Sequence, residues 1–193
     1  DIEIRGLKLA LPELSPALRG DADLTGSLRG PLSELRTSAK LSAALGQVQI
    51  LAQVDLSSSV PSWSAELSSE ALAPARLLTE PIPALTSDLL LKAEGVGDPT
   101  GEGRVGATIE MTRPRLELPT EASQDATPIA LPALRLEAAM AKGASTLQLA
   151  LREEGASLDL EASLPSLPPA KARLEATGAG VNLGAWARAF GVP

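Results

Sequence analysis

The side chains that usually perform catalysis are almost absent from this sequence. Its 193 residues include no His, Cys or Tyr, so the chain has no imidazole base near neutral pH and no thiol nucleophile. Zinc sites and Ser–His triads are excluded for the same reason. A pair of carboxylates of the glycosidase type remains, but only Trp63, Trp186 and Phe190 could bind a sugar ring. We predict that the chain is not an enzyme and holds no metal and no cofactor.

The short motifs that resemble binding sites have simpler explanations. Residues 95–97 and 101–103 read Gly-Val-Gly and Gly-Glu-Gly, but no Lys-Ser/Thr and no strand-to-helix context follows them, so we interpret them as turns. Asp21 and Asp23 lie two residues apart, a spacing that could hold a hard cation weakly. The same spacing is typical of the solvated face of a strand, and we favour that reading.

Charge and hydropathy narrow the class of partner. The net charge is −7, from 24 acidic and 17 basic residues without a basic run, so we predict no nucleic-acid partner. No run of about 18 apolar residues is present to span a bilayer as a helix. The chain begins at Asp1 without a leader-like segment, so it resembles a processed or excised piece whose anchor would lie outside it.

Hydrophobic periodicity predicts strands, although the composition alone suggests helix. The sequence has 35 Leu and 32 Ala but only 13 Val plus Ile. From residue 47 to residue 56, however, apolar and polar residues alternate, with Leu51 as the exception. Similar alternation recurs in about a dozen segments separated by Gly and Pro, which predicts a mainly β, antiparallel meander. Helices are expected at Glu13–Arg19, Glu70–Thr79 and Asn182–Phe190. A loop is expected at residues 112–132, around a short strand near residues 116–118.

The apolar rows of these strands are aliphatic, because aromatic residues make up only 2% of the chain. One interpretation is the filled core of a β-sandwich, which would usually contain more aromatic side chains. The other is an open aliphatic groove, and helix packing rather than partner binding explains Trp186 and Phe190. The residues predicted to line the groove are Leu24, Leu28, Val48, Ile50, Ala52, Val54, Leu89, Leu91, Val105, Ala107, Ile109, Leu134, Leu136, Leu147, Leu149, Leu158 and Leu160.

Two stretches resemble the repeats of the TamB and AsmA-like periplasmic proteins of diderm bacteria. They are residues 18–35 (LRGDADLTGSLRGPLSEL) and 72–95 (LAPARLLTEPIPALTSDLLLKAEG), in which a short helix and a Pro-rich link lead into a strand. Residues 176–193 resemble the start of another such unit. By this resemblance, residues 1–193 are one segment of a longer protein, with approximate units at 1–70, 71–180 and 181–193.

The resemblance implies a long curved sheet with an open hydrophobic trough. It implies a periplasmic segment that moves phospholipid, or another acyl-chain lipid, between the inner and outer membranes. An inner-membrane anchor outside this chain and an outer-membrane assembly barrel are the other implied partners. Two alternatives remain open: a structural or adhesive β-sandwich or β-solenoid, and a scaffold that holds a client β-strand.

Overall fold

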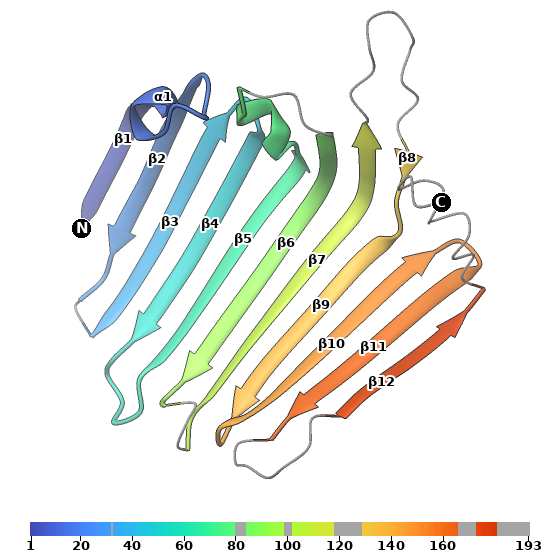
Figure 1. Ribbon diagram of the computed structural model, residues 1–193. Coiled ribbons are helices and arrows are strands. Elements are labelled where there is room, and N and C mark those ends of the chain that lie inside the picture. The colour runs from blue at the N-terminus through green and yellow to red at the C-terminus, as the bar shows by residue number, and fades with distance from the viewer. Residues whose placement is uncertain (32, 80–83, 99–101, 118–128, 166–172, 181–193) are drawn as a thin grey trace, which may run out of the picture.

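A computed structural model describes residues 1–31, 33–79, 84–98, 102–117, 129–165 and 173–180. Twelve strands form one sheet, seen as a single layer in Figure 1. Their bounds are β1 (Ile2–Ala10), β2 (Asp21–Arg29), β3 (Glu34–Ala43), β4 (Gly46–Asp55), β5 (Ser62–Leu72), β6 (Ala84–Val96), β7 (Arg104–Glu117), β8 (Ile129–Ala130), β9 (Ala133–Ala141), β10 (Ala144–Glu153), β11 (Ala156–Leu164) and β12 (Arg173–Ala179).

The strands follow the chain order across the sheet, and every pairing is antiparallel. The order is β1-β2-β3-β4-β5-β6-β7-β9-β10-β11-β12, and the short β8 pairs with the end of β7. β1 and β12 are the outer strands and do not pair with each other, so the sheet is open rather than closed into a barrel. The predicted fold class, a mainly β open antiparallel sheet, is confirmed.

Period-two alternation and tight turns outweigh the helix propensity of Leu and Ala. β9 and β10 are joined by Lys142 and Gly143, which have φ angles of 50° and 72°. Positive φ at both positions is typical of the two-residue turns that match the twist of a hairpin. Such turns pair neighbouring strands directly, and the pairing satisfies the backbone groups of residues that would otherwise favour a helix.

Helices are shorter than the sequence predicted. The expected helix at Glu70–Thr79 is wrong over most of its length: β5 continues to Leu72, and only a 3₁₀ turn, η1 (Pro74–Leu77), follows. Glu70 instead pairs with Gln47 in the sheet. The helix expected at residues 13–19 is displaced to the four residues of α1 (Leu11–Leu14). Asn182–Phe190 lies outside the described residues.

Residues 112–132 are predicted as a loop around a short strand near residues 116–118, and the strand found there is longer, because it is the end of β7. β7 continues to Glu117, and Leu116 pairs both with Leu85 of β6 and with Ile129 of β8. The sequence obscured this because the alternation shifts at a bulge: Arg113 has a φ angle of 52° and the following residue is Pro114. Residues 118–128 lie outside the described part of the chain.

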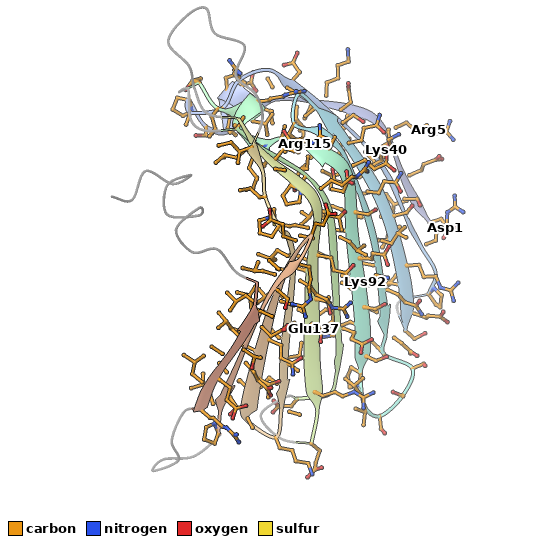
Figure 2. All side chains as sticks on the ribbon, turned by 90° about the vertical axis from the view of Figure 1, so that its right-hand side faces the viewer. Asp1, Arg5, Lys40, Lys92, Arg115 and Glu137 are labelled. Atoms are coloured by element: carbon orange, nitrogen blue, oxygen red, sulfur yellow. The ribbon has the colours of Figure 1, made fainter. Side chains whose placement is uncertain are left out.

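The sheet is bowed and has two chemically different faces. Figure 2 shows nitrogen and oxygen atoms gathered on one side, with Arg5 and Lys40 pointing outward there, while the side chains on the opposite side are mostly carbon. Within the described residues, no helix is long and apolar enough to cross a membrane. The two faces are called the apolar face and the polar face below.

Candidate functional site

The pairing register places every residue of the predicted groove lining on the apolar face. Directly paired residues point to the same side of a sheet, and side chains along each strand alternate between sides. One row of paired residues, running from β1 to β6, is Leu7, Leu24, Leu41, Val48, Ser69 and Leu89. A second row, from β6 to β12, is Leu91, Ile109, Leu136, Leu149, Leu160 and Ala176. Aliphatic side chains therefore continue across the sheet in both rows, with Ser69 as the polar exception.

This face carries no second sheet within the described residues. The aliphatic side chains buried there are Leu11, Ala22, Val48 and Ala73, and in the described part of the chain no large side chain is completely buried. A filled two-layer sandwich would bury most of its inward-facing side chains between the layers. The described strands form one layer, so the open arrangement is the one observed.

All four of these buried side chains lie at one corner of the sheet, which we call the capped corner. It comprises the ends of β2–β6 at the top of Figure 1, beside α1 and η1. Ser69 and Ser87 are buried at the same end, and the Ser69 hydroxyl donates a hydrogen bond of 2.7 Å to the Gln47 carbonyl. The one part of the apolar face that resembles a protein core is therefore small.

Backbone hydrogen bonds tie the two helical segments together above this corner. Arg19 N–H donates to the Leu77 carbonyl at 2.7 Å, and Thr79 N–H donates to the Ala17 carbonyl at 3.0 Å. Ala73 N–H also donates to the Leu45 carbonyl at 2.8 Å, which fixes η1 to the β3–β4 turn. Segments about 60 residues apart in the chain thus close one corner of the sheet together.

The opposite end of the apolar face, at the bottom of Figure 1, is open. Trp63, Leu147 and Leu164 lie at or toward this end with 40%, 43% and 58% of their surface exposed. A hollow of about 370 Å³ lies here over β7, β9, β10 and β11. We call it the apolar hollow, and its side-chain lining is Val105, Ala107, Ala138, Met140, Ser145, Leu147, Ala162 and Leu164.

A larger hollow, of about 1310 Å³, lies on the polar face. It extends from β2 to β10, and its lining includes Ser, Thr, Gln and charged side chains, several alanines and the exposed Leu51. Ion pairs in its wall join Lys92 to Glu66 at 3.2 Å and Arg36 to Glu34 at 2.6 Å. Sequence reasoning missed this hollow, because alternation assigns residues to a face but does not give the twist that makes a face concave.

The Asp88 carboxylate lies between two bulged strands, β5 and β7. It accepts a 2.9 Å hydrogen bond from the Ala71 N–H on one side and a 2.7 Å bond from the Arg113 Nε on the other. Ala71 and Arg113 have φ angles of 51° and 52°. The Ala71 N–H and the Arg113 guanidinium lower the pKa of Asp88 because both stabilise its charged form. Asp88 therefore holds both bulges in place.

The described residues include no group of three or more carboxylates that could hold a metal ion. Comparison of the chain with protein families, with curated proteins and with solved structures finds no match. The arrangement itself offers a mainly aliphatic surface that is closed at one corner and open elsewhere. The other side of the same sheet is the polar face.

Proposed function

We propose that this chain is a segment of a lipid-transfer protein whose apolar face shields phospholipid acyl chains. The observation that carries the proposal is the mainly aliphatic face, which crosses eleven strands and has no second layer over it in the described residues. Soluble proteins rarely expose an apolar surface this large unless it binds something.

The dimensions and chemistry of the face suit an acyl chain. β10 has ten residues, which corresponds to about 33 Å at the usual rise per residue. Removing each CH₂ group from water is worth about 0.8 kcal/mol. A bilayer offers the same gain, so transfer between bilayer and groove is nearly balanced. A mainly aliphatic surface with few polar side chains favours such exchange over tight, permanent binding.

The resemblance of residues 18–35 and 72–95 to TamB and AsmA-like repeats supports a cellular location for the proposed function. On that basis we assign the chain to the periplasm of a diderm bacterium. The inner membrane would be reached through a segment outside this chain, and an outer-membrane assembly barrel is the proposed protein partner.

The open sheet edges favour a second candidate function, a scaffold for a client β-strand. The outer edge of β12 has no hydrogen-bonding strand within the described residues, and Arg173–Ala179 contains no proline or bulge that would block one. Titration with peptides of alternating apolar and polar residues would test this function separately from lipid binding.

The proposed function is tested by gentle purification of the chain followed by native mass spectrometry and lipid extraction. We expect bound phospholipid, and we expect the delipidated protein to bind a fluorescent fatty acid. A protein that folds but carries no lipid and binds no probe would contradict the proposal.

Two neighbouring residues on opposite faces provide matched variants. Leu147→Glu places a carboxylate on the apolar face, where the side chain is 43% exposed and the charge can reach water, so folding should be retained while lipid binding falls. Gln148→Glu places the same group on the polar face and should leave lipid binding unchanged. Equal lipid binding by both variants would exclude β10 from the lipid path.

A further inference from the structure

Three exposed apolar side chains gather where β4 leads into β5. Leu56 and Val60 lie in the connection between the two strands, and Trp63 is the second residue of β5. Figure 1 shows this connection at the lower edge of the sheet, on the side of the open end. We call these three residues the apolar tip. Single exposed apolar residues are ordinary on a protein surface, but three within eight residues form a patch.

Two glycines at the end of β6 make room for the apolar tip. A Cβ atom added to Gly95 would overlap the indole of Trp63. A Cβ atom added to Gly97 would lie 3.1 Å from Cγ1 of Val60. The Gly-Val-Gly motif therefore supports two side chains of the apolar tip, and the rest of each side chain is exposed to water.

The polar groups of the same connection are largely bound to one another. The Ser57 hydroxyl and N–H donate hydrogen bonds of 2.6 Å and 2.8 Å to the Asp55 carboxylate, which lies on the polar face. The Ser58 hydroxyl donates to the Val60 carbonyl. Polar groups that already have partners cost less free energy to remove from water than unpaired ones do. The connection can therefore enter a less polar environment without losing these bonds.

The apolar tip carries no charge, unlike two other connections at the lower edge. Residues 56–63 read LSSSVPSW, whereas the β6–β7 connection contains Asp98 and Glu102 and the β9–β10 turn contains Lys142. Within the described residues, the indole N–H of Trp63 donates no hydrogen bond. Tryptophan is enriched at bilayer interfaces, where its ring meets acyl chains and its N–H finds an acceptor. The chemistry of the apolar tip therefore fits a lipid surface better than a charged protein surface.

One row of the register connects the apolar tip to the apolar hollow. Trp63 pairs with Gly95, and Gly95 pairs with Val105. Val105 pairs in turn with Met140, and both line the apolar hollow. A bilayer in contact with the apolar tip would therefore meet the open end of the apolar face.

We infer that the apolar tip inserts into the interfacial region of a lipid bilayer and docks the open end of the sheet against it. The inference adds a membrane contact to the proposed function, but it does not require that the protein carry lipid. The strength of interfacial binding scales with the apolar area that is inserted. Three side chains therefore give a weak and reversible contact.

The test measures the binding of the protein to large unilamellar vesicles of phosphatidylcholine by flotation. We expect the unaltered protein to bind, and the variant Leu56→Ser/Val60→Ser to bind about tenfold more weakly, which is 1.4 kcal/mol. In a Trp186→Phe background, added vesicles should shift the emission of Trp63 to shorter wavelength, and lipids brominated close to the head group should quench it. Both changes should be smaller when the double variant is made in the same background.

Leu51→Ser is the matched control, because Leu51 is 54% exposed and Leu56 is 52% exposed, but Leu51 lies on the polar face of β4. It should leave vesicle binding unchanged. All the altered side chains are exposed, so each variant should keep the thermal midpoint of the unaltered protein. Vesicles of equal parts phosphatidylcholine and phosphatidylglycerol should bind no more tightly, because the net charge of the chain is −7.

Equal vesicle binding by the unaltered protein and the double variant would overturn the inference. An equal loss in Leu51→Ser would also overturn it, because adsorption would then depend on any exposed leucine. If the unaltered protein bound neither kind of vesicle, the inference would fall and a protein partner would be the better explanation of the apolar tip.

A fluorescent fatty acid in vesicle-free solution separates this inference from the proposed function. The double variant should bind the fatty acid as the unaltered protein does, because the hollow lining does not include the apolar tip. A protein that docks on vesicles through the apolar tip but binds no fatty acid would support the inference and contradict the proposed function alone.

Discussion

The capped corner and the open end belong to the same apolar face but are built differently. At the capped corner, α1 and η1 meet above the strand ends, and Leu11, Val48 and Ala73 are buried. At the open end, Trp63 and Leu147 remain 40% and 43% exposed. The difference indicates that stability is concentrated at one corner, while the rest of the face is left available for a ligand.

The largest expected effect compares two valines on the same face of β4. Val48 is 7% exposed at the capped corner, whereas Val54 is half-buried near the open end. Val48→Asp buries an unpaired charge and should cost several kcal/mol, a large part of a typical domain stability of about 5–15 kcal/mol. Val54→Asp can expose its carboxylate and should cost at least about 2 kcal/mol less. Urea unfolding of both variants measures the difference.

Gln53→Asp is the control for this pair, because Gln53 lies beside Val54 on the polar face and is exposed. It should change the free energy of unfolding by less than about 0.5 kcal/mol. Equal losses for Val48→Asp and Val54→Asp would show that the whole face is packed like a core, and the distinction between the two regions would be wrong.

A smaller effect is expected at Asp88, whose hydrogen bonds hold the bulges of β5 and β7. Asp88→Asn keeps the shape of the side chain but removes its charge, and should cost about 1–2 kcal/mol at neutral pH. Because the pKa of Asp88 lies below its ordinary value of 3.8, this stabilisation is present above that pH and is lost as the pH falls through the folded-state pKa.

The unaltered protein and Asp88→Asn should therefore approach each other in stability in acid. Urea unfolding at neutral pH and at about pH 3 measures the convergence. Asp23→Asn on the polar face of β2 serves as the control, because Asp23 is exposed and pairs with Ser42 of β3 in regular register. A constant difference between the unaltered protein and Asp88→Asn across this range would contradict the role assigned to the Asp88 charge.

Alternation predicted much of the fold from sequence. It placed all of the expected lining residues on one face, and it identified Leu51 as the exception, which is indeed on the polar face and 54% exposed. It failed where the alternation shifts, at the bulges of Ala71 and Arg113, because a bulge adds one residue to a strand without a strong sequence signal. The helix expected at Glu70–Thr79 was lost for this reason.

The capped corner and the hollows could not be predicted in the same way. The cap depends on Leu18 pairing with Leu78, a contact between distant segments that local periodicity does not contain. The two hollows depend on the twist and bow of the whole sheet, to which every strand contributes. The sequence therefore predicts which residues share a face, while the three-dimensional arrangement decides where that face is covered or concave.

The next prediction concerns the close contact between Trp63 and Gly95 toward the open end. A Cβ atom added to Gly95 would overlap the indole of Trp63, so Gly95→Ala must displace the ring. Since Trp63 is already 40% exposed, we expect it to move outward at a cost of about 1 kcal/mol, the lower part of the range for overpacking. In a Trp186→Phe background, the fluorescence of Trp63 should shift to longer wavelength.

Gly106→Ala is the control, because the nearest heavy atom to a Cβ there is the Ala138 carbonyl oxygen at 4.0 Å. It should leave the stability and the Trp63 emission nearly unchanged. A loss above about 3 kcal/mol for Gly95→Ala, with unshifted emission, would mean that the ring is confined as in a packed core.

The smallest effect is expected on the polar face, at the ion pair between Lys92 and Glu66. Their side chains are 58% and 41% exposed, and Nζ lies 3.2 Å from Oε2. Exposed pairs contribute about 0.2–1 kcal/mol, because water already solvates both charges and ordering the side chains costs entropy. A double-mutant cycle with Lys92→Gln and Glu66→Gln should give a coupling energy in this range, and about 1 M salt should reduce it further.

This coupling energy shows how little a charge contributes to stability where water solvates it fully, and the cost of Val54→Asp can be compared with it. A coupling above about 2 kcal/mol would indicate that the polar hollow shields its ion pairs from water, and the polar face would then have to be treated as a second binding surface.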